Sequence, residues 1–130
     1  MLLKAYDNDN EVYYADFNWK ELLKAIRNVK VSYTEISKFP AVKRDLALLL
    51  DKKVQFAEIE KIAYETEKKL LKEVSLFDVY EGKNLEAGKK SYAVSFLLQD
   101  ENATLNDKQI DKIMSKLVKN LEDKLNAKLR

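Results

Sequence analysis

The order of hydrophobic periodicities after Pro40 restricts this chain more than any other feature of its sequence. Pro40 is the only proline, and proline pushes the residue before it toward an extended conformation, which favours the start of a new unit here. Strand and helix patterns then follow in the order strand, helix, strand, strand, helix and a short final strand. The predicted strands cover residues 42–50, 71–80, 91–99 and 127–130, and the predicted helices cover residues 56–69 and 107–125.

This order predicts an α+β fold, a ferredoxin-like βαββαβ sandwich with two helices on one face of a four-stranded antiparallel sheet. The expected strand order is 4-1-3-2, and the other sheet face stays open. Strict alternation would place Val74, Leu76, Asp78 and Tyr80 on one face of the second strand, and Phe77 and Val79 on the other. Its apolar pattern is imperfect, which a β-bulge would explain. The predicted core includes Leu46, Leu48, Ile59, Ile62, Phe96, Ile113, Leu117 and Leu121.

The chain is expected to have two parts. Residues 1–38 are predicted to be an N-terminal extension or linker from a preceding module, and residues 39–130 one domain. Within the extension, residues 12–17 have the composition of a strand, and Asn18 predicts the N-cap of a helix over about 19–28. One strand and one helix cannot close a core, so they must pack on the rest of the chain or on a neighbour.

Composition argues against catalysis within this chain. It contains neither histidine nor cysteine, which removes the commonest general base, the commonest metal ligand and every thiol. No glycine-rich phosphate loop is present. We therefore predict no catalytic residue, no metal site and no cofactor here. No apolar run approaches the roughly 20 residues of a membrane span, and no signal peptide is visible at Met1, so the expected location is cytoplasmic, without a membrane partner.

Basic residues are unevenly spread, although the net charge is only +2. Lysines recur at helical spacing toward the end of the chain, where they form either a solvated helix face or a phosphate-facing stripe. The stripe comprises Lys108, Lys112, Lys116, Lys119, Lys124 and Lys128.

A second group of basic residues is predicted to flank the open sheet face or its rim, where they could contact RNA phosphates. These candidates are Lys43, Arg44, Lys89 and Lys90. Arg44 and Asp45 at the start of the first strand could instead form a structural ion pair.

The third predicted strand carries the small residues Ser91, Ala93 and Ser95 opposite its core positions. Small side chains on an open sheet leave room for a flat group, and RNA-binding modules stack unpaired bases in this way. Tyr80 is the candidate platform, or else a half-buried filler at the strand end. Asp78 shares its face, and the glycine-bearing loop brings both residues close to Ser91.

Five short motifs resemble those of ferredoxin-fold anticodon-binding domains, the kind that end the beta subunit of bacterial phenylalanyl-tRNA synthetases. They occur in the family's order and spacing, and only a glycine before Ala127 is missing. The motifs are F-P-A-V-K-R-D-L at 39–46, L-F-D-V-Y-E-G at 76–82, G-K-K-S at 88–91, T-L-N at 104–106 and A-K-L-R at 127–130.

The resemblance implies that this domain binds the anticodon of tRNA(Phe), and not DNA. The whole enzyme of the family is an α2β2 heterotetramer that attaches phenylalanine to tRNA with ATP and Mg²⁺, and its active site lies on the alpha subunit. The fragment would thus belong to a ligase without being catalytic itself. Asp78 would accept the N1–H and N2–H₂ donors of guanine, Tyr80 would stack on a base, Ser91 would add a hydrogen bond, and Ala93 would keep the surface low.

Other ferredoxin-like proteins remain alternatives. Amino-acid-binding regulatory domains use a glycine-bearing loop after the first strand, and acylphosphatase-like enzymes use a phosphate-binding loop with arginine there. Residues 51–53 supply neither. A generic RNA-recognition module would want aromatic residues on the open face of its central strands, whereas Tyr92 and Phe96 are predicted to face the core.

Overall fold

The computed structural model describes residues 12–33 and 35–130; the first eleven residues and Thr34, all within the predicted extension, lie outside the described residues. The chain divides between Glu35 and Ile36 into two parts, a few residues before the predicted boundary, and each part is described by itself.

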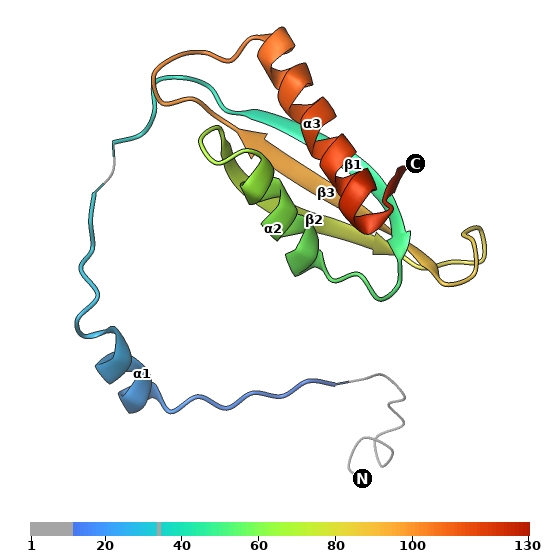
Figure 1. Ribbon diagram of the computed structural model, residues 1–130. Helices are drawn as coiled ribbons and strands as arrows, with labels where there is room; N and C mark the ends of the chain where they lie inside the picture. Colours follow the sequence, from blue (N-terminus) through green and yellow to red (C-terminus); the bar gives the residue numbers. More distant parts are fainter. Residues whose placement is uncertain (1–11, 34) are drawn as a thin grey trace, which may run out of the picture. The chain divides into compact units, whose positions relative to one another are not determined.

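The part from Ile36 to Arg130 is a four-stranded antiparallel sheet with two helices packed on one of its faces (Figure 1). The strands follow the spatial order β2-β3-β1-β4. The predicted ferredoxin-like fold and its strand order are therefore confirmed. The elements are β1 (Val42–Asp51), α2 (Phe56–Thr66), β2 (Leu71–Tyr80), β3 (Lys89–Leu98), α3 (Asp107–Leu125) and β4 (Lys128–Leu129).

The core lies between the helices and the covered sheet face. The helices contribute buried residues such as Ile59 and Leu117, and the sheet contributes Leu48 and Phe96. Every predicted core residue is buried except Leu46, which packs against the core but is only half-buried. The reason is that β4 is short and pairs with β1 only at positions 48 and 49, so the edge of β1 at Leu46 has no strand beside it.

Asparagine residues cap both ends of α3. Asn106 accepts from the Gln109 backbone N–H at 2.9 Å, and the Gln109 side chain accepts from the Asn106 N–H at 3.0 Å, which completes the predicted capping box. The helix ends at Leu125, and its C-cap Asn126 has a φ of 50° in the left-handed region, a conformation that asparagine tolerates better than most residues.

Two lysines of α3 contact α2 where the two helices pack together. The Lys116 ammonium donates to the Thr66 carbonyl at 3.1 Å, and Lys124 forms an ion pair with Glu65 at 3.2 Å. Asn120 also donates to the Thr66 hydroxyl at 2.7 Å. These contacts place the helical part of the lysine stripe on the helix layer, away from the open sheet face.

Strand β2 is irregular in two places, with register shifts against β3 between Leu71 and Glu73 and between Leu76 and Asp78. The second shift confirms the predicted bulge. It leaves Phe77 without a partner on β3, after which Asp78 pairs with Ala93. A bulge adds one residue to one strand, so the side chains beyond it change face relative to strict alternation.

The described residues of the N-terminal part contain one helix, α1 (Trp19–Ile26), which is capped as predicted by Asn18, whose side chain accepts from the Lys20 backbone N–H at 3.1 Å. No residue of α1 is buried, and Trp19 is 65% exposed. The predicted strand at 12–17 is wrong, because these residues are not a strand in the structure. A strand needs a neighbour for its backbone hydrogen bonds, and the four strands of the described chain pair with one another.

Candidate nucleic-acid interface

The open sheet face is built from residues that lie directly opposite one another on neighbouring strands, because such residues project to the same side. Two adjacent rows cross all four strands at one end of the β2–β3 hairpin. We call them the tyrosine row and the alanine row. From β2 to β4 the tyrosine row is Tyr80, Ser91, Leu49 and Lys128, and the alanine row is Asp78, Ala93, Ala47 and Arg130.

The structure brings together all four residues predicted to bind the anticodon. Asp78 lies opposite Ala93, and Tyr80 lies opposite Ser91. Tyr80 is 37% exposed, whereas Ser91 is only 6% exposed, between Tyr80 and Leu49 in its row. A base can therefore contact the Ser91 hydroxyl only if the side chains around it move.

Two residues, Gly82 and Arg130, contribute to the position of the Tyr80 ring. A Cβ atom at Gly82 would overlap the phenol group, so glycine is needed for the ring to lie where it does. On the other side, the guanidinium carbon of Arg130 lies 5.4 Å from the ring centre, within the range of a cation–π contact.

Phe77 is a second exposed aromatic residue on this face. The Lys43 ammonium lies 5.9 Å from its ring centre, and Lys43 projects from the open face opposite Leu97. Phe77 is 58% exposed. The predicted alternation is wrong here: the bulge puts Phe77 on the same face as Asp78 and Tyr80, and leaves Val74 and Leu76 on the helix-covered face.

The four basic candidates divide between the two sides of the sheet. Lys43 lies on the open face, and Lys89 lies at its rim opposite Asp51. Arg44 and Lys90 lie on the helix-covered side, and Lys90 is only 7% exposed, with its ammonium 4.5 Å from the Tyr92 ring centre. The expectation that all four flank the open face or its rim is therefore wrong for Arg44 and Lys90, which project from the helix-covered side. Neighbouring residues of a strand point to opposite faces.

The same rule separates Arg44 from Asp45. Arg44 donates to the Lys43 carbonyl at 3.2 Å, and Asp45, on the open face, accepts a hydrogen bond from Ser95. The ion pair considered between Arg44 and Asp45 is not among those formed by the described residues.

The loop beside Tyr80 is anchored to the turn after β1. Lys52 forms an ion pair with Glu81 at 2.9 Å, and its backbone N–H donates to the Gly88 carbonyl at 2.9 Å. The hydrogen bond and positive charge of Lys52 lower the pKa of the Glu81 carboxyl below its ordinary value. The end of the hairpin that carries the tyrosine row is thus held by contacts on two sides.

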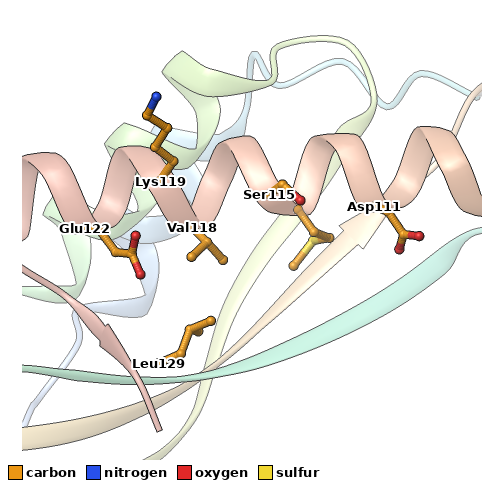
Figure 2. A pocket seen from close by; sticks show the side chains of 7 residues that line it. Asp111, Ser115, Val118, Lys119, Glu122 and Leu129 are labelled. Carbon is orange, nitrogen blue, oxygen red and sulfur yellow. The ribbon is translucent and has the colours of Figure 1, made fainter.

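A separate groove runs between α3 and Leu129 (Figure 2). Its volume is about 430 Å³, and it is lined by Asp111 and Glu122, whose carboxylates lie on its side of α3, and by Lys119, whose ammonium points away from Leu129. This mixed charge, with two acidic groups, does not favour a nucleic-acid backbone.

Within the described residues, no group of three or more carboxylates is arranged to hold a metal ion. None of the described helices is long and apolar enough to cross a membrane.

The fold and this surface define a class, the ferredoxin-like sandwich with an open sheet face that carries exposed aromatic and charged side chains. Residues 37–130 match the ferredoxin-fold anticodon binding domain, and the chain belongs to this family. The predicted family resemblance is confirmed.

Three of the similar proteins share one description. Over 129 residues, 99% of this chain, it is 92% identical to the phenylalanine–tRNA ligase beta subunit of Bacteroides fragilis and 89% identical to that of Bacteroides thetaiotaomicron. Identity to the beta subunit of Bacillus subtilis is 42% over 120 residues, 92% of this chain. The chain spans 16% of the length of the two Bacteroides relatives and 15% of the third.

Two further residues of this surface lie in the family motifs at 76–82 and 127–130, yet neither was a predicted site residue. Arg130 closes the alanine row from β4, and Phe77 reaches the open face through the bulge. Both depend on strand register, which a single sequence does not display.

Proposed function

We propose that this chain binds the anticodon of tRNA(Phe) as the C-terminal part of a phenylalanine–tRNA ligase beta subunit. One observation carries the proposal: in a chain of the anticodon-binding family, Asp78, Tyr80, Ser91 and Ala93 occupy adjacent positions on the open sheet face. The full-length protein would act with an alpha subunit in an α2β2 assembly in the cytoplasm.

The chemistry of the four residues suits an unpaired guanine. An ionised carboxylate only accepts hydrogen bonds, so Asp78 complements the N1–H and N2–H₂ donors of guanine, a pair that adenine lacks. The Tyr80 ring provides a stacking surface, and stacking of one base on an aromatic residue contributes about 1–3 kcal/mol. Ser91 adds a hydrogen bond once the ring above it moves, and Ala93 leaves space for the base.

The test replaces Asp78→Asn and compares binding of RNA stem-loops that carry guanine or adenine at the first anticodon position. The amide keeps the size of the side chain but adds donors that oppose those of guanine. Glu73→Gln is the matched control, because Glu73 is an exposed carboxylate on the same strand and the same face, opposite Leu97.

We expect Asp78→Asn to lose most of the preference for guanine and Glu73→Gln to retain it, with both melting temperatures unchanged. If the Asp78→Asn variant prefers guanine as strongly as the parent, Asp78 does not recognise the base.

ATP, Mg²⁺ and phenylalanine would be bound elsewhere in the whole enzyme. The isolated chain is therefore expected to catalyse no phenylalanine-dependent ATP–pyrophosphate exchange. Exchange above the level of a mock purification would contradict this expectation.

A further inference from the structure

We propose that Arg130 is a second guanine-recognising residue, which donates hydrogen bonds to O6 and N7 of the base whose Watson–Crick edge is bound by Asp78. The inference rests on the proposed function and extends it to a residue at the opposite edge of the sheet. It arises from the alanine row, which has an acceptor at one end and a donor at the other.

The spacing of the row suits a purine lying across it. Asp78 and Arg130 lie on the two edge strands, and three strand spacings of about 4.8 Å put their backbones roughly 14 Å apart. Only the methyl groups of Ala93 and Ala47 project between them. Once the Arg130 side chain moves off the sheet, a short carboxylate on one side and a long guanidinium on the other leave the space of a flat base above this floor.

Arg130 is already turned inward over the sheet. Its backbone N–H donates to the Ala47 carbonyl at 3.0 Å, which extends the pairing of β4 with β1 and sets its place in the row. Its guanidinium carbon lies 5.4 Å from the Tyr80 ring, on the far edge strand. The side chain therefore crosses the open face and does not extend into solvent.

The two ends of the row complement two different edges of guanine, the Watson–Crick edge at Asp78 and the edge with O6 and N7 at Arg130. Arginine has only donors, and its planar fork makes two parallel hydrogen bonds to O6 and N7 of guanine. Adenine carries an amino group in place of O6, so it would set donor against donor at Arg130. Both ends of the row would thus favour guanine, and each through different atoms of the base.

Because Asp78 and Arg130 would bind different atoms of guanine, modified bases that lack one of these atoms test each residue separately. Binding of this chain is measured with anticodon stem-loops that carry guanosine, 7-deazaguanosine, inosine or adenosine at the first anticodon position. 7-Deazaguanosine lacks only the N7 acceptor, and inosine lacks only the N2 amino group. The variants are Arg130→Gln, Arg130→Lys and, as a control, Lys128→Gln, which removes an exposed positive charge from the same strand and face.

In the parent chain, we expect 7-deazaguanosine to weaken binding roughly 3- to 10-fold, the effect of one hydrogen bond. Arg130→Gln should weaken guanosine binding about 5- to 150-fold and should bind guanosine and 7-deazaguanosine equally. Arg130→Lys should lose most of the N7 dependence, because an ammonium lacks the planar fork. Lys128→Gln should keep it, and every variant should keep its sensitivity to inosine, which reports on Asp78.

Two failures are distinguishable. A parent chain that does not prefer guanosine to adenosine overturns the proposed function and this inference together. A parent that prefers guanosine but binds 7-deazaguanosine equally well overturns only the role of Arg130, as does an Arg130→Gln variant that retains the N7 dependence. A purely structural role in holding Tyr80 would lower affinity for all four RNAs by the same factor.

Discussion

The guanidinium of Arg130 lies 5.4 Å from the centre of the Tyr80 ring, although the two residues belong to opposite edge strands of the sheet. Their side chains meet over Ser91 and the two alanines, which are too small to separate them. In this arrangement the platform and the cation cover the place where a base would lie. Binding must therefore move at least one of the two side chains.

The aromatic face of Tyr80 should contribute to RNA affinity through stacking. Replacing Tyr80→Leu keeps an apolar side chain but removes the ring, and should weaken binding of an anticodon stem-loop by about 1–3 kcal/mol. Tyr80→Phe keeps the ring and should bind nearly as well as the parent. Fluorescence titration of both variants checks this, and equal losses for the two would assign the effect to the hydroxyl group.

Gly82 should matter for binding because of the space it leaves. In Gly82→Ala the added methyl group overlaps the Tyr80 phenol, so the ring must turn away from its present position. We expect weaker RNA binding and a changed NMR environment of the Tyr80 ring.

Gly88→Ala is the comparison for that variant. Gly88 has a φ of 81° but no atom near its added methyl group, so alanine there should lower the free energy of unfolding by about 1 kcal/mol through backbone strain. Its RNA binding, measured where the chain is folded, should stay close to that of the parent. If Gly88→Ala weakened RNA binding and Gly82→Ala did not, the role assigned to Gly82 would be wrong.

RNA binding should depend only moderately on salt. The described open face and its rim carry Lys43, Lys89, Lys128 and Arg130 within the sheet pairing, and acidic residues such as Asp78 lie among them. Two to four phosphate contacts predict a slope of roughly −1.5 to −3 for log affinity against log salt concentration. Titrations across a salt series measure the slope, and an affinity independent of salt would exclude phosphate contacts.

The N-cap of α3 should contribute measurably to stability. Asn106→Ala removes the acceptor for the Gln109 backbone N–H and should lower the free energy of unfolding by about 1 kcal/mol. Asn102→Ala, at an exposed position just before the helix, should change it little. Urea denaturation measures the free energy of unfolding of both variants. Equal values for the two would show that the Asn106 cap does not stabilise the helix.

The Glu81 carboxyl should titrate below the ordinary range for glutamate, because Lys52 donates to it and carries a positive charge beside it. The stabilisation from this ion pair is present above the ordinary pKa and is lost as the pH falls through the lowered one. In Lys52→Gln the pKa of Glu81 should rise toward its ordinary value. NMR titration of the side chain measures both, and identical curves would show that the ion pair does not form in solution.

Local patterns in the sequence determined the elements and the fold class. Apolar strand patterns placed β1, β2 and β3, although the alternation of β2 is imperfect; helical spacing placed the apolar stripe of α3, and Asn106 marked where that helix begins. These features depend on neighbouring residues along the chain, which is why one sequence displays them. The motif around Asp78 and Tyr80 likewise indicated the binding candidates, because the bulge leaves those two residues on the same face.

Only the tertiary structure decided which distant residues share the open face. It separated Lys43 from Arg44 and Lys89 from Lys90, since a residue's face depends on strand register and not on its charge. It brought Phe77 to the open face through the bulge, and it placed Arg130 in one row with Asp78 by pairing β4 beside β1. The predicted strand at 12–17 is absent for the same reason, because a strand forms through hydrogen bonds to another segment, which its own residues do not specify.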